Sequence, residues 1–369
     1  MNDAARQADS AASQTGLTPI ERVLDYARWA PSGDNTQPWR FEVQDAQRAV
    51  VHGHDTREHC VYDLDGHGSH LALGALLETI AIAATTEGCR ADVAHRSGSP
   101  DAAPLFDVTL VPRPGLAPDP LVPAIRTRAV QRRPMRTRRL EAAEKQALEA
   151  AVQPGYRVMW LETPAQKWAA ARLLFANAGL RLTMREAYEV HRRIIAWNAC
   201  FSTDRIPDRS LGLDPLTLKL MRWVMGSWAR VRFFNAYLAG TLAPRIQLDL
   251  VPALACGAHF VLVADRPATT LVDYVEAGRR LQRFWLTAER LGLKLQPEVT
   301  PLIFARYLRE GRRFTAQADI LAAAAPMAER LRGLLAGNLE NAVFMGRIGA
   351  GRDAACRSLR RPLAELQAR

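Results

Sequence analysis

The densest run of residues with chemical potential is Ala30-Pro31-Ser32-Gly33-Asp34-Asn35-Thr36-Gln37-Pro38-Trp39. It follows an apolar-periodic run over 20–29, which predicts a helix, and precedes 40–43, which predicts a strand. Two prolines stiffen the backbone of this loop, and its backbone N–H groups and short hydroxyl and amide side chains suit a planar ligand with many acceptor atoms. The alternative is a plain helix-to-strand connection made of turn residues.

A second candidate is the stretch over 126–139, which is dense in arginine: Arg126, Arg128, Arg132, Arg133, Arg136, Arg138 and Arg139. A guanidinium group matches phosphate oxygens with two parallel hydrogen bonds, so the stretch predicts an anion site. A solvated basic face is the alternative. The interleaved Ala129, Val130 and Met135 favour a partly buried segment, in which uncompensated arginines would be costly.

Both stretches resemble motifs of the nitroreductase flavoprotein family. Ala-Pro-Ser-x-x-Asn-x-Gln-Pro-Trp resembles the family's FMN-contacting loop, and the segment over 128–135 resembles its opening Arg-x-Ser/Thr-x-Arg/Lys-Arg-x-Phe. The resemblance implies that the loop binds FMN through Pro31, Ser32, Asn35 and Gln37. It also implies Arg128 on the FMN phosphate and Arg132 beside the flavin pyrimidine, where a cation stabilises the reduced flavin. Val130 stands where the family usually has a hydroxyl.

Three later segments add candidates for the same site. The turn over 294–300 lies where the family presents a backbone N–H to flavin N5, which implicates Pro297 and Glu298. The predicted strand over 342–349 adds Arg347 to the cofactor-binding candidates. The closing stretch over 357–363 resembles the family's basic segment near the FMN phosphate, which implicates Arg360 and Arg361; a basic C-terminal tail is the alternative.

Two predicted helices, over 71–87 and 271–291, match at a constant offset of 204 when 70–88 is compared with 274–292, with glycines, a leucine and an alanine at equivalent positions. Small residues such as Gly74 and Gly278 allow close helix packing, and Gly88 and Gly292 end each helix. We therefore expect an α+β, nitroreductase-like fold of two tandem units forming an intramolecular pseudo-dimer: a flexible tail over 1–15, a first unit over 16–120 and a second over 121–369. Because each motif occurs once, in opposite halves, one FMN per chain is expected.

A long insertion is expected over 192–252. The segments over 185–188 and 206–215 resemble the tandem branch of the family, which includes the dormancy-associated nitroreductase-like proteins of actinobacteria, and the resemblance implies a lid over the flavin. The stretch over 216–237 is rich in Trp, Phe and Arg and predicts one amphipathic helix. A lid or packing helix is favoured over a membrane-surface helix.

Composition excludes several classes. The net charge of +11 comes without a recognisable nucleic-acid-binding module, so no nucleic acid is expected. The five scattered cysteines, without a CxxC, predict free thiols, no structural zinc and a reducing cytoplasm. No apolar run approaches a membrane span, so no stable membrane insertion is expected. Five histidines between 52 and 70 are interpreted as surface or capping residues in preference to a metal site.

The predicted function is an FMN-dependent oxidoreductase that passes hydride from NAD(P)H through flavin N5 to an electron-poor small molecule. No catalytic side chain is required, because the cofactor performs the chemistry. The chain is expected to be a monomer, as a pseudo-dimer, or a weak homo-oligomer. The alternative is an FMN-sequestering or storage protein with a closed lid and no NAD(P)H turnover; a specialised biosynthetic flavin oxidoreductase lies between the two.

Overall fold

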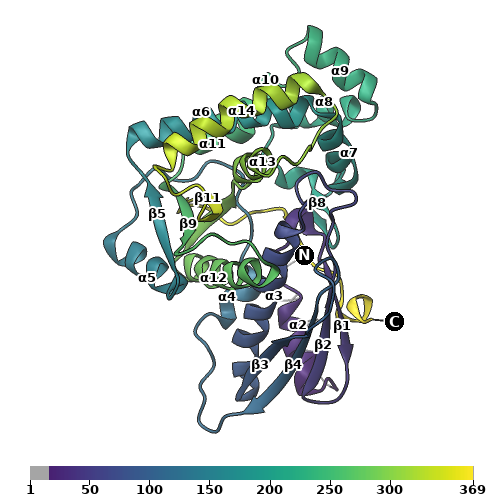
Figure 1. The fold of residues 1–369 in the computed structure, drawn as a ribbon, viewed down its shortest axis with the longest axis vertical. Coiled ribbons are helices and arrows are strands. Elements are labelled where there is room, and N and C mark those ends of the chain that lie inside the picture. Colours follow the sequence, from purple (N-terminus) through teal and green to yellow (C-terminus); the bar gives the residue numbers. More distant parts are fainter. Residues whose placement is uncertain (1–15, 369) are drawn as a thin grey trace.

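The computed structural model describes residues 16–368; the predicted tail over 1–15 therefore lies outside the described residues. Two four-stranded antiparallel sheets lie on opposite sides of a set of central helices, and further helices pack over them (Figure 1). The fold class is α+β, as the sequence predicts.

The first sheet has the order β1-β2-β4-β3 and is made of β1 (Trp39–Val43), β2 (Arg48–Gly53), β3 (Cys89–His95) and β4 (Leu105–Pro112). Its apolar face packs on α2 (Pro19–Ala27) and α3 (His67–Ala84). A capping box of Thr18 and Glu21 fixes the start of α2. Alternate residues of β3 are exposed, as expected for a sheet with one solvated face.

The second sheet has the order β10-β11-β9-β5 and is made of β5 (Tyr156–Leu161), β9 (Ala258–Ala264), β10 (Leu293–Pro297) and β11 (Ala342–Ala350). Every residue of β9 is buried, because helices cover both faces. One face packs on α5 (Ala142–Val152) and α12 (Leu271–Arg290). The other packs on α6 (Pro164–Thr183), α13 (Thr300–Arg309) and α14 (Ala318–Leu334).

The two sheets share one succession of elements. In each, a helix precedes two strands, a long helix follows, and two further strands complete the same spatial order, so that β1, β2, β4 and β3 correspond to β5, β9, β11 and β10. The long helices α3 and α12 correspond and pack against each other between the sheets.

Gly74 and Gly278 are the crossing point of α3 and α12. A Cβ atom on Gly74 would lie 1.9 Å from the carbonyl oxygen of Val275, and one on Gly278 would lie 2.1 Å from that of Leu71. Only glycine permits backbones this close. The prediction that these two glycines support close helix approach is confirmed, and the approach proves to be reciprocal.

The insertion between β5 and β9 differs from the expected helices. The helical stretch before and into the expected insertion is two helices, α6 and α7 (Arg185–Ile194), because Met184 has extended backbone angles. The predicted helix over 216–237 is likewise two, α8 (Pro215–Val224) and α9 (Trp228–Tyr237), because Ser227 is extended. The sequence patterns described above also do not predict, among other elements, β3, α13 or the short α4 (Val122–Thr127). The insertion continues through short β6 (Ile195–Ala196), β7 (Phe201–Ser202), β8 (Ile206–Pro207), α10 (Leu242–Pro244), a π-helical turn (Arg245–Leu250) and α11 (Val251–Leu254).

The C-terminal segment over 351–368, here called the strap, returns from the second sheet to the first. Its strand β12 (Arg357–Ser358) pairs in parallel with β7, and Gln367 bridges Phe41 of β1. Cys200 and Cys356 form a disulfide beside this pairing. The prediction of free thiols is wrong for these two cysteines, because strand pairing brings together residues that lie 156 apart in sequence; Cys60, Cys89 and Cys256 are free and buried.

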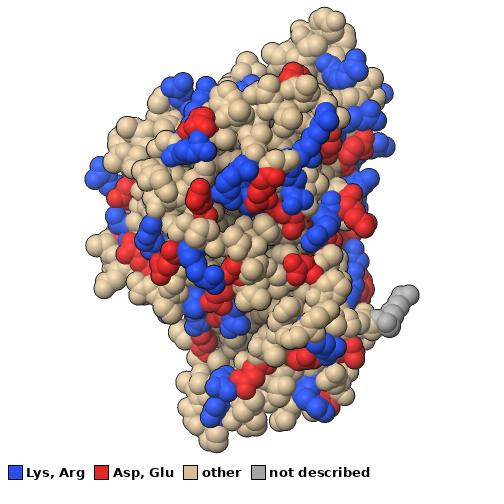
Figure 2. Space-filling model, in the orientation of Figure 1, with Lys and Arg blue, Asp and Glu red and all other residues tan. Residues whose placement is uncertain are grey.

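Among the described residues, one helix, spanning His67–Glu87, is long and apolar enough to cross a membrane, and 78% of its apolar window is buried within the protein. The expectation that no run reaches this length is therefore corrected, and the burial is that of a core helix. Acidic and basic side chains intermix over most of the face in Figure 2.

Candidate functional site

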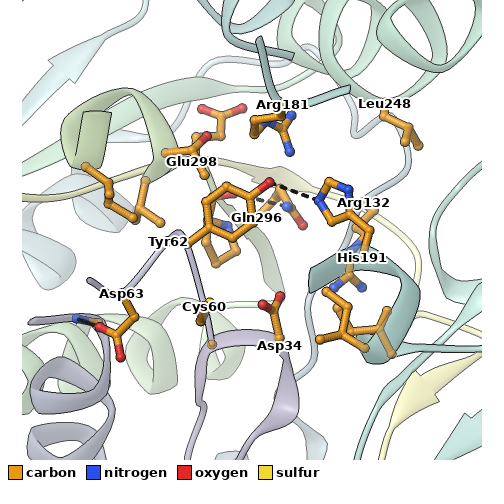
Figure 3. Close-up of a pocket in the computed structure, with 18 of the residues that line it drawn as sticks. Asp34, Cys60, Tyr62, Asp63, Arg132, Arg181, His191, Leu248, Gln296 and Glu298 are labelled. Carbon is orange, nitrogen blue, oxygen red and sulfur yellow. Dashed lines mark hydrogen bonds between the residues drawn. The ribbon is translucent and has the colours of Figure 1, made fainter. Parts of the chain in front are cut away.

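Two adjacent cavities lie where the first sheet's loop, α3, β10 and the strap meet. One, of about 310 Å³, is lined by Ser32, Asn35, Arg128, Trp285 and Arg360 among others, and is here called the arginine cavity. The second, of about 340 Å³, is lined by Tyr62, Arg181, His191, Leu248 and Glu298 among others, and is here called the tyrosine cavity (Figure 3). Gly33, Asp34, Gly68, Arg132, Ile206, Gln296, Pro297, Val299 and Ile303 line both.

The predicted loop over 30–39 has an unusual backbone. Asp34, Asn35 and Gln37 all have positive φ angles, of 53°, 64° and 51°. Such left-handed conformations cost free energy in residues other than glycine and concentrate at functional sites. Pro31, Ser32 and Asn35 line the arginine cavity as the motif predicts.

Gln37 is fully buried and does not line either cavity, so the structure does not place this candidate at a ligand. Its amide Nε2 donates to the carbonyl oxygen of Thr203 at 2.8 Å, and its Oε1 accepts from the backbone N–H of Arg361 at 2.9 Å. Gln37 therefore ties the loop to the insertion and to the strap. The Arg361 side chain lies outside both cavities and is 3.7 Å from Asp204.

Arg128 and Arg360 are buried in the wall of the arginine cavity, and within residues 16–368 neither pairs with a carboxylate. Arg128 donates to the carbonyl oxygen of Trp29 and lies 4.7 Å over the Trp285 ring; Arg360 donates to the carbonyl oxygen of Ala30. Burial lowers the pKa of Arg128 to about 9, and burial with the neighbouring Arg128 lowers that of Arg360. Guanidinium groups keep their charge in proteins, so this wall is suited to an anion.

Arg132 lies between the cavities with Asp34. Burial lowers the pKa of Arg132 to about 10, while the nearby Asp34 opposes the decrease. Burial raises the pKa of Asp34 to about 6, against the attraction of Arg132. The backbone oxygen of Arg132 accepts a hydrogen bond from Arg347 at 2.8 Å. Arg132 and the titratable carboxyl group of Asp34 are therefore neighbours where the two cavities meet.

Besides His67 Nδ1, which lies 3.3 Å from the Asp65 carboxylate, three buried polar atoms at the arginine cavity have no hydrogen-bond partner within the described chain: Asn35 Oδ1, Gln296 Oε1 and Arg128 Nε. Unsatisfied buried polar atoms are rare and costly, and a ligand can satisfy them. Two acceptors and one donor here match a ligand that is both a hydrogen-bond donor and an anion.

Glu298 differs from the expected flavin contact. Its carboxylate lies 2.7 Å from His259 Nδ1 and 2.9 Å from Arg347, and all three side chains are buried. Burial opposes the charge of His259, but Glu298 raises the pKa of this imidazole to about 10. The backbone N–H of Glu298 donates to Met345. Glu298 and Arg347 therefore stabilise the cavity wall as a buried ion cluster, and Glu298 has no amide to offer a flavin.

Pro297 lines both cavities but has no N–H group. The next residues, Val299 and Thr300, begin α13, where first-turn amides lack intrahelical acceptors. Val299 lines both cavities. The backbone N–H groups near this turn that lack intrahelical acceptors are therefore those at the start of α13.

The tyrosine cavity contains groups that the sequence analysis did not select. Tyr62 Oη lies 3.0 Å from His191 Nε2, and Arg181 donates to Asp249 at 2.8 Å (Figure 3). Burial lowers the pKa of His191 to about 3, so the imidazole is neutral at physiological pH, and burial raises the pKa of Tyr62. Burial also raises the pKa of the Cys60 thiol to about 12, so it is not a nucleophile. Tyr62 and His191 lie 129 residues apart in the sequence, so no local motif predicts their contact.

The histidines between 52 and 70 have separate partners. His52 contacts Glu42, His70 Nε2 contacts the carbonyl oxygen of Asp101, and His67 stacks on Tyr274. The part of the chain that the structure describes holds no group of three or more His, Cys, Asp or Glu side chains arranged for a metal ion.

No family model matches the chain. It is 26% identical over 292 residues, 78% of its length, to the uncharacterized protein MT1398 of Mycobacterium tuberculosis (strain CDC 1551 / Oshkosh), and it spans about two fifths (39%) of that protein. Among solved structures, it is similar to the FMN-dependent nitroreductase NfnB of Mycobacterium smegmatis in complex with NADPH, with a TM-score of 0.36 and 17% identity over 67% of this chain and 96% of that one. A nitroreductase-like family protein of Bacillus cereus aligns with a TM-score of 0.33 and 13% identity over 68% and 96%.

Proposed function

We propose that this chain binds one FMN in the arginine cavity and transfers hydride from NAD(P)H to an electron-poor small molecule. The observation behind the proposal is that Arg128 and Arg360 are buried in the wall of one cavity and that neither has a carboxylate partner among residues 16–368. A dianionic phosphate compensates two such cations with charge-assisted hydrogen bonds. Ser32 lines the same cavity, and its hydroxyl, which accepts from the backbone N–H of Gln37, can add a donor.

The cavity also fits the rest of the cofactor. The unpartnered oxygens of Asn35 and Gln296 accept from a ring N–H such as that of flavin, and Arg132 lies at the boundary with the tyrosine cavity. When bound, FMN supplies two-electron hydride chemistry. The guanidinium of Arg132 stabilises negative charge on a reduced ring, and the start of α13 offers backbone donors.

The tyrosine cavity is the proposed place for the nicotinamide and, in turn, the acceptor. Its apolar walls, which include Leu174, Ile194 and Leu248, exclude water from a bound ring. Tyr62 presents a hydroxyl to this space, and His191 can hold that hydroxyl in position. A cavity of about 340 Å³ beside the cofactor favours turnover over the alternative, a storage protein whose lid closes the site.

We further propose that the two sheet units arose by duplication and form an intramolecular pseudo-dimer, with a first unit over 16–120 and a second over 121–369. The shared order of strands and the α3–α12 crossing support this proposal. The loop at 30–39 comes from one unit and Arg128 from the other, so one cofactor per chain follows. A cytoplasmic location remains part of the proposal.

The test is the absorbance spectrum and FMN-to-chain ratio of purified protein, followed by anaerobic mixing with NADPH. The enzyme proposal expects about one FMN per chain, bleached by NADPH and reoxidised by a quinone or nitroaromatic compound. A yellow protein that dithionite reduces but NADPH and NADH do not would favour storage. A colourless protein that takes up no FMN would reject both.

A further inference from the structure

Helices α8 and α9 and the turn after them bear a cluster of exposed apolar side chains, here called the α8–α9 surface. Its members are Leu216, Leu220, Trp223, Phe233, Tyr237, Leu238, Leu242 and Ile246. Leu216 and Tyr237 are 77% and 76% exposed. No residue of α8 is buried, and Val231 is the one buried residue of α9. Met221 of α8 lines the tyrosine cavity, whereas the apolar side chains of the α8–α9 surface are exposed.

The cluster is continuous across the two helices. Leu216, Leu220 and Trp223 follow the spacing of one helical face. Trp223 lies 5.7 Å from Phe234, and Phe233 lies 5.2 Å from Tyr237 between ring centres. Exposed apolar patches of this kind indicate a surface that binds something.

Within the segment that forms this surface, the charged side chains have one sign, although the exposed Asp214 caps the start of α8. From 215 to 248 the chain has five basic residues and no acidic one; the basic residues are Lys219, Arg222, Arg230, Arg232 and Arg245. The first four are exposed. Figure 2 shows few charged side chains on the protruding end over α9, whereas both signs intermix over the rest of this face.

We propose that the α8–α9 surface docks on an anionic lipid bilayer. Trp, Phe, Tyr and Leu side chains enter the boundary between headgroups and acyl chains, while lysine and arginine meet lipid phosphates. Long basic side chains can reach the headgroups while their stems cover apolar surface. No part of the chain crosses the bilayer in this proposal, and it is independent of the flavin.

Charge favours a bilayer over a second copy of the chain. A symmetric dimer through this surface would place two sets of basic residues against each other without acidic partners on either helix pair. Like charges across an interface cost free energy, whereas anionic lipids compensate them.

The test is flotation of the full chain with vesicles of phosphatidylcholine alone and of phosphatidylcholine with about one third phosphatidylglycerol. We expect binding to the anionic vesicles only, decreasing as salt rises from about 0.05 M to about 0.5 M. No binding to anionic vesicles at low salt, or equal binding to both compositions, would overturn the proposal.

Two variants, each with a control variant elsewhere on the protein, test whether the α8–α9 surface is the part that binds lipid. Serine at Leu216, Leu220, Phe233 and Tyr237 should weaken binding about tenfold or more, whereas serine at Leu116, Trp168 and Val272, exposed apolar residues elsewhere, should not. The pair Lys219→Gln and Arg232→Gln should weaken binding more than Arg113→Gln with Arg139→Gln, which removes equal charge elsewhere.

Circular dichroism verifies folding of each variant. If both apolar variants bind like the wild type, the proposal is wrong. If light scattering shows that the wild type is a dimer and the α8–α9 serine variant a monomer, the surface is an interface between copies and the proposal is also wrong.

Discussion

The charges of the two adjacent cavities are arranged in opposite ways. On the tyrosine cavity, Glu298 is paired with Arg347 and His259, and Arg181 is paired with Asp249. On the arginine cavity, Arg306 is likewise paired with Asp65, but Arg128 and Arg360 are buried beside backbone carbonyls and an aromatic ring, with no carboxylate partner among residues 16–368. Paired charges need no ligand for their compensation, whereas buried unpaired cations are stabilised when an anion binds. The difference supports our proposal that the arginine cavity binds an anion and the tyrosine cavity takes neutral reactants.

The largest expected effect is on protein stability, through the buried ion cluster of Glu298, His259 and Arg347 beside the tyrosine cavity. Glu298→Gln leaves His259 and Arg347 buried without their carboxylate, so the free energy of unfolding should fall by about 3–5 kcal/mol. Glu298→Gln should also remove a pH dependence: His259, whose pKa is raised to about 10, stabilises the wild type below about pH 6.5, and this stabilisation is lost toward pH 10. Urea unfolding between pH 6 and 10 measures both.

The matched control is Glu329→Gln, which removes the partner of Arg332 in an exposed surface pair and should cost less than about 1 kcal/mol. Equal effects of the two substitutions would contradict the buried cluster.

Arg128→Met removes a buried charge that has no carboxylate partner. In the apo-protein it should therefore raise the free energy of unfolding, whereas Glu298→Gln lowers it. We expect FMN affinity to fall about 100-fold, while the free energy of unfolding without FMN rises by about 1 kcal/mol. Fluorescence titration with FMN and urea unfolding of the apo-protein measure the two effects. Arg133→Met, exposed in the same segment, is the control. Unchanged FMN affinity would remove Arg128 from the site.

Tyr62→Phe tests the tyrosine cavity alone. The substitution keeps the ring but removes the hydroxyl beside His191, so kcat/KM with a quinone acceptor should fall about tenfold to a hundredfold at unchanged FMN content. Tyr156→Phe, whose hydroxyl lies near Asp273 instead, is the control. A parallel loss of FMN from the Tyr62 variant would mean that the two cavities do not have separate roles.

Asp34→Asn, at the boundary, should have the smallest effect. Because burial raises the pKa of Asp34 to about 6, the folded state favours the protonated acid, and this stabilisation is lost as the pH rises from about 4 through 6. The variant should therefore be more stable than the wild type by about 1 kcal/mol at pH 8, with a smaller difference at pH 4. Thermal unfolding across this range shows it, and a pH-independent difference would contradict the shifted pKa.

The sequence predicts the local parts of this account well. The loop at 30–39, Arg128, Arg132 and the two glycine-containing helices are each marked by a few neighbouring residues, and the structure brings them together around the two cavities. The match of α3 with α12 was visible because close backbone packing requires glycine at one fixed position in each helix.

The parts that the sequence did not predict depend on tertiary contacts. Gln37 matches the motif, yet its amide holds the insertion and the strap, which no local pattern encodes. The Tyr62–His191 contact and the Cys200–Cys356 disulfide join residues 129 and 156 positions apart. The amphipathic stretch over 216–237 is apolar as noted, but its exposure depends on the break at Ser227 and on which faces the core leaves uncovered.

The most direct measurement of the central claim is calorimetric titration of the apo-protein with FMN and with riboflavin. The account predicts one FMN per chain and about 100-fold weaker binding of riboflavin, because riboflavin lacks the phosphate that compensates Arg128 and Arg360. Equal affinities for the two flavins, or no binding of either, would contradict it.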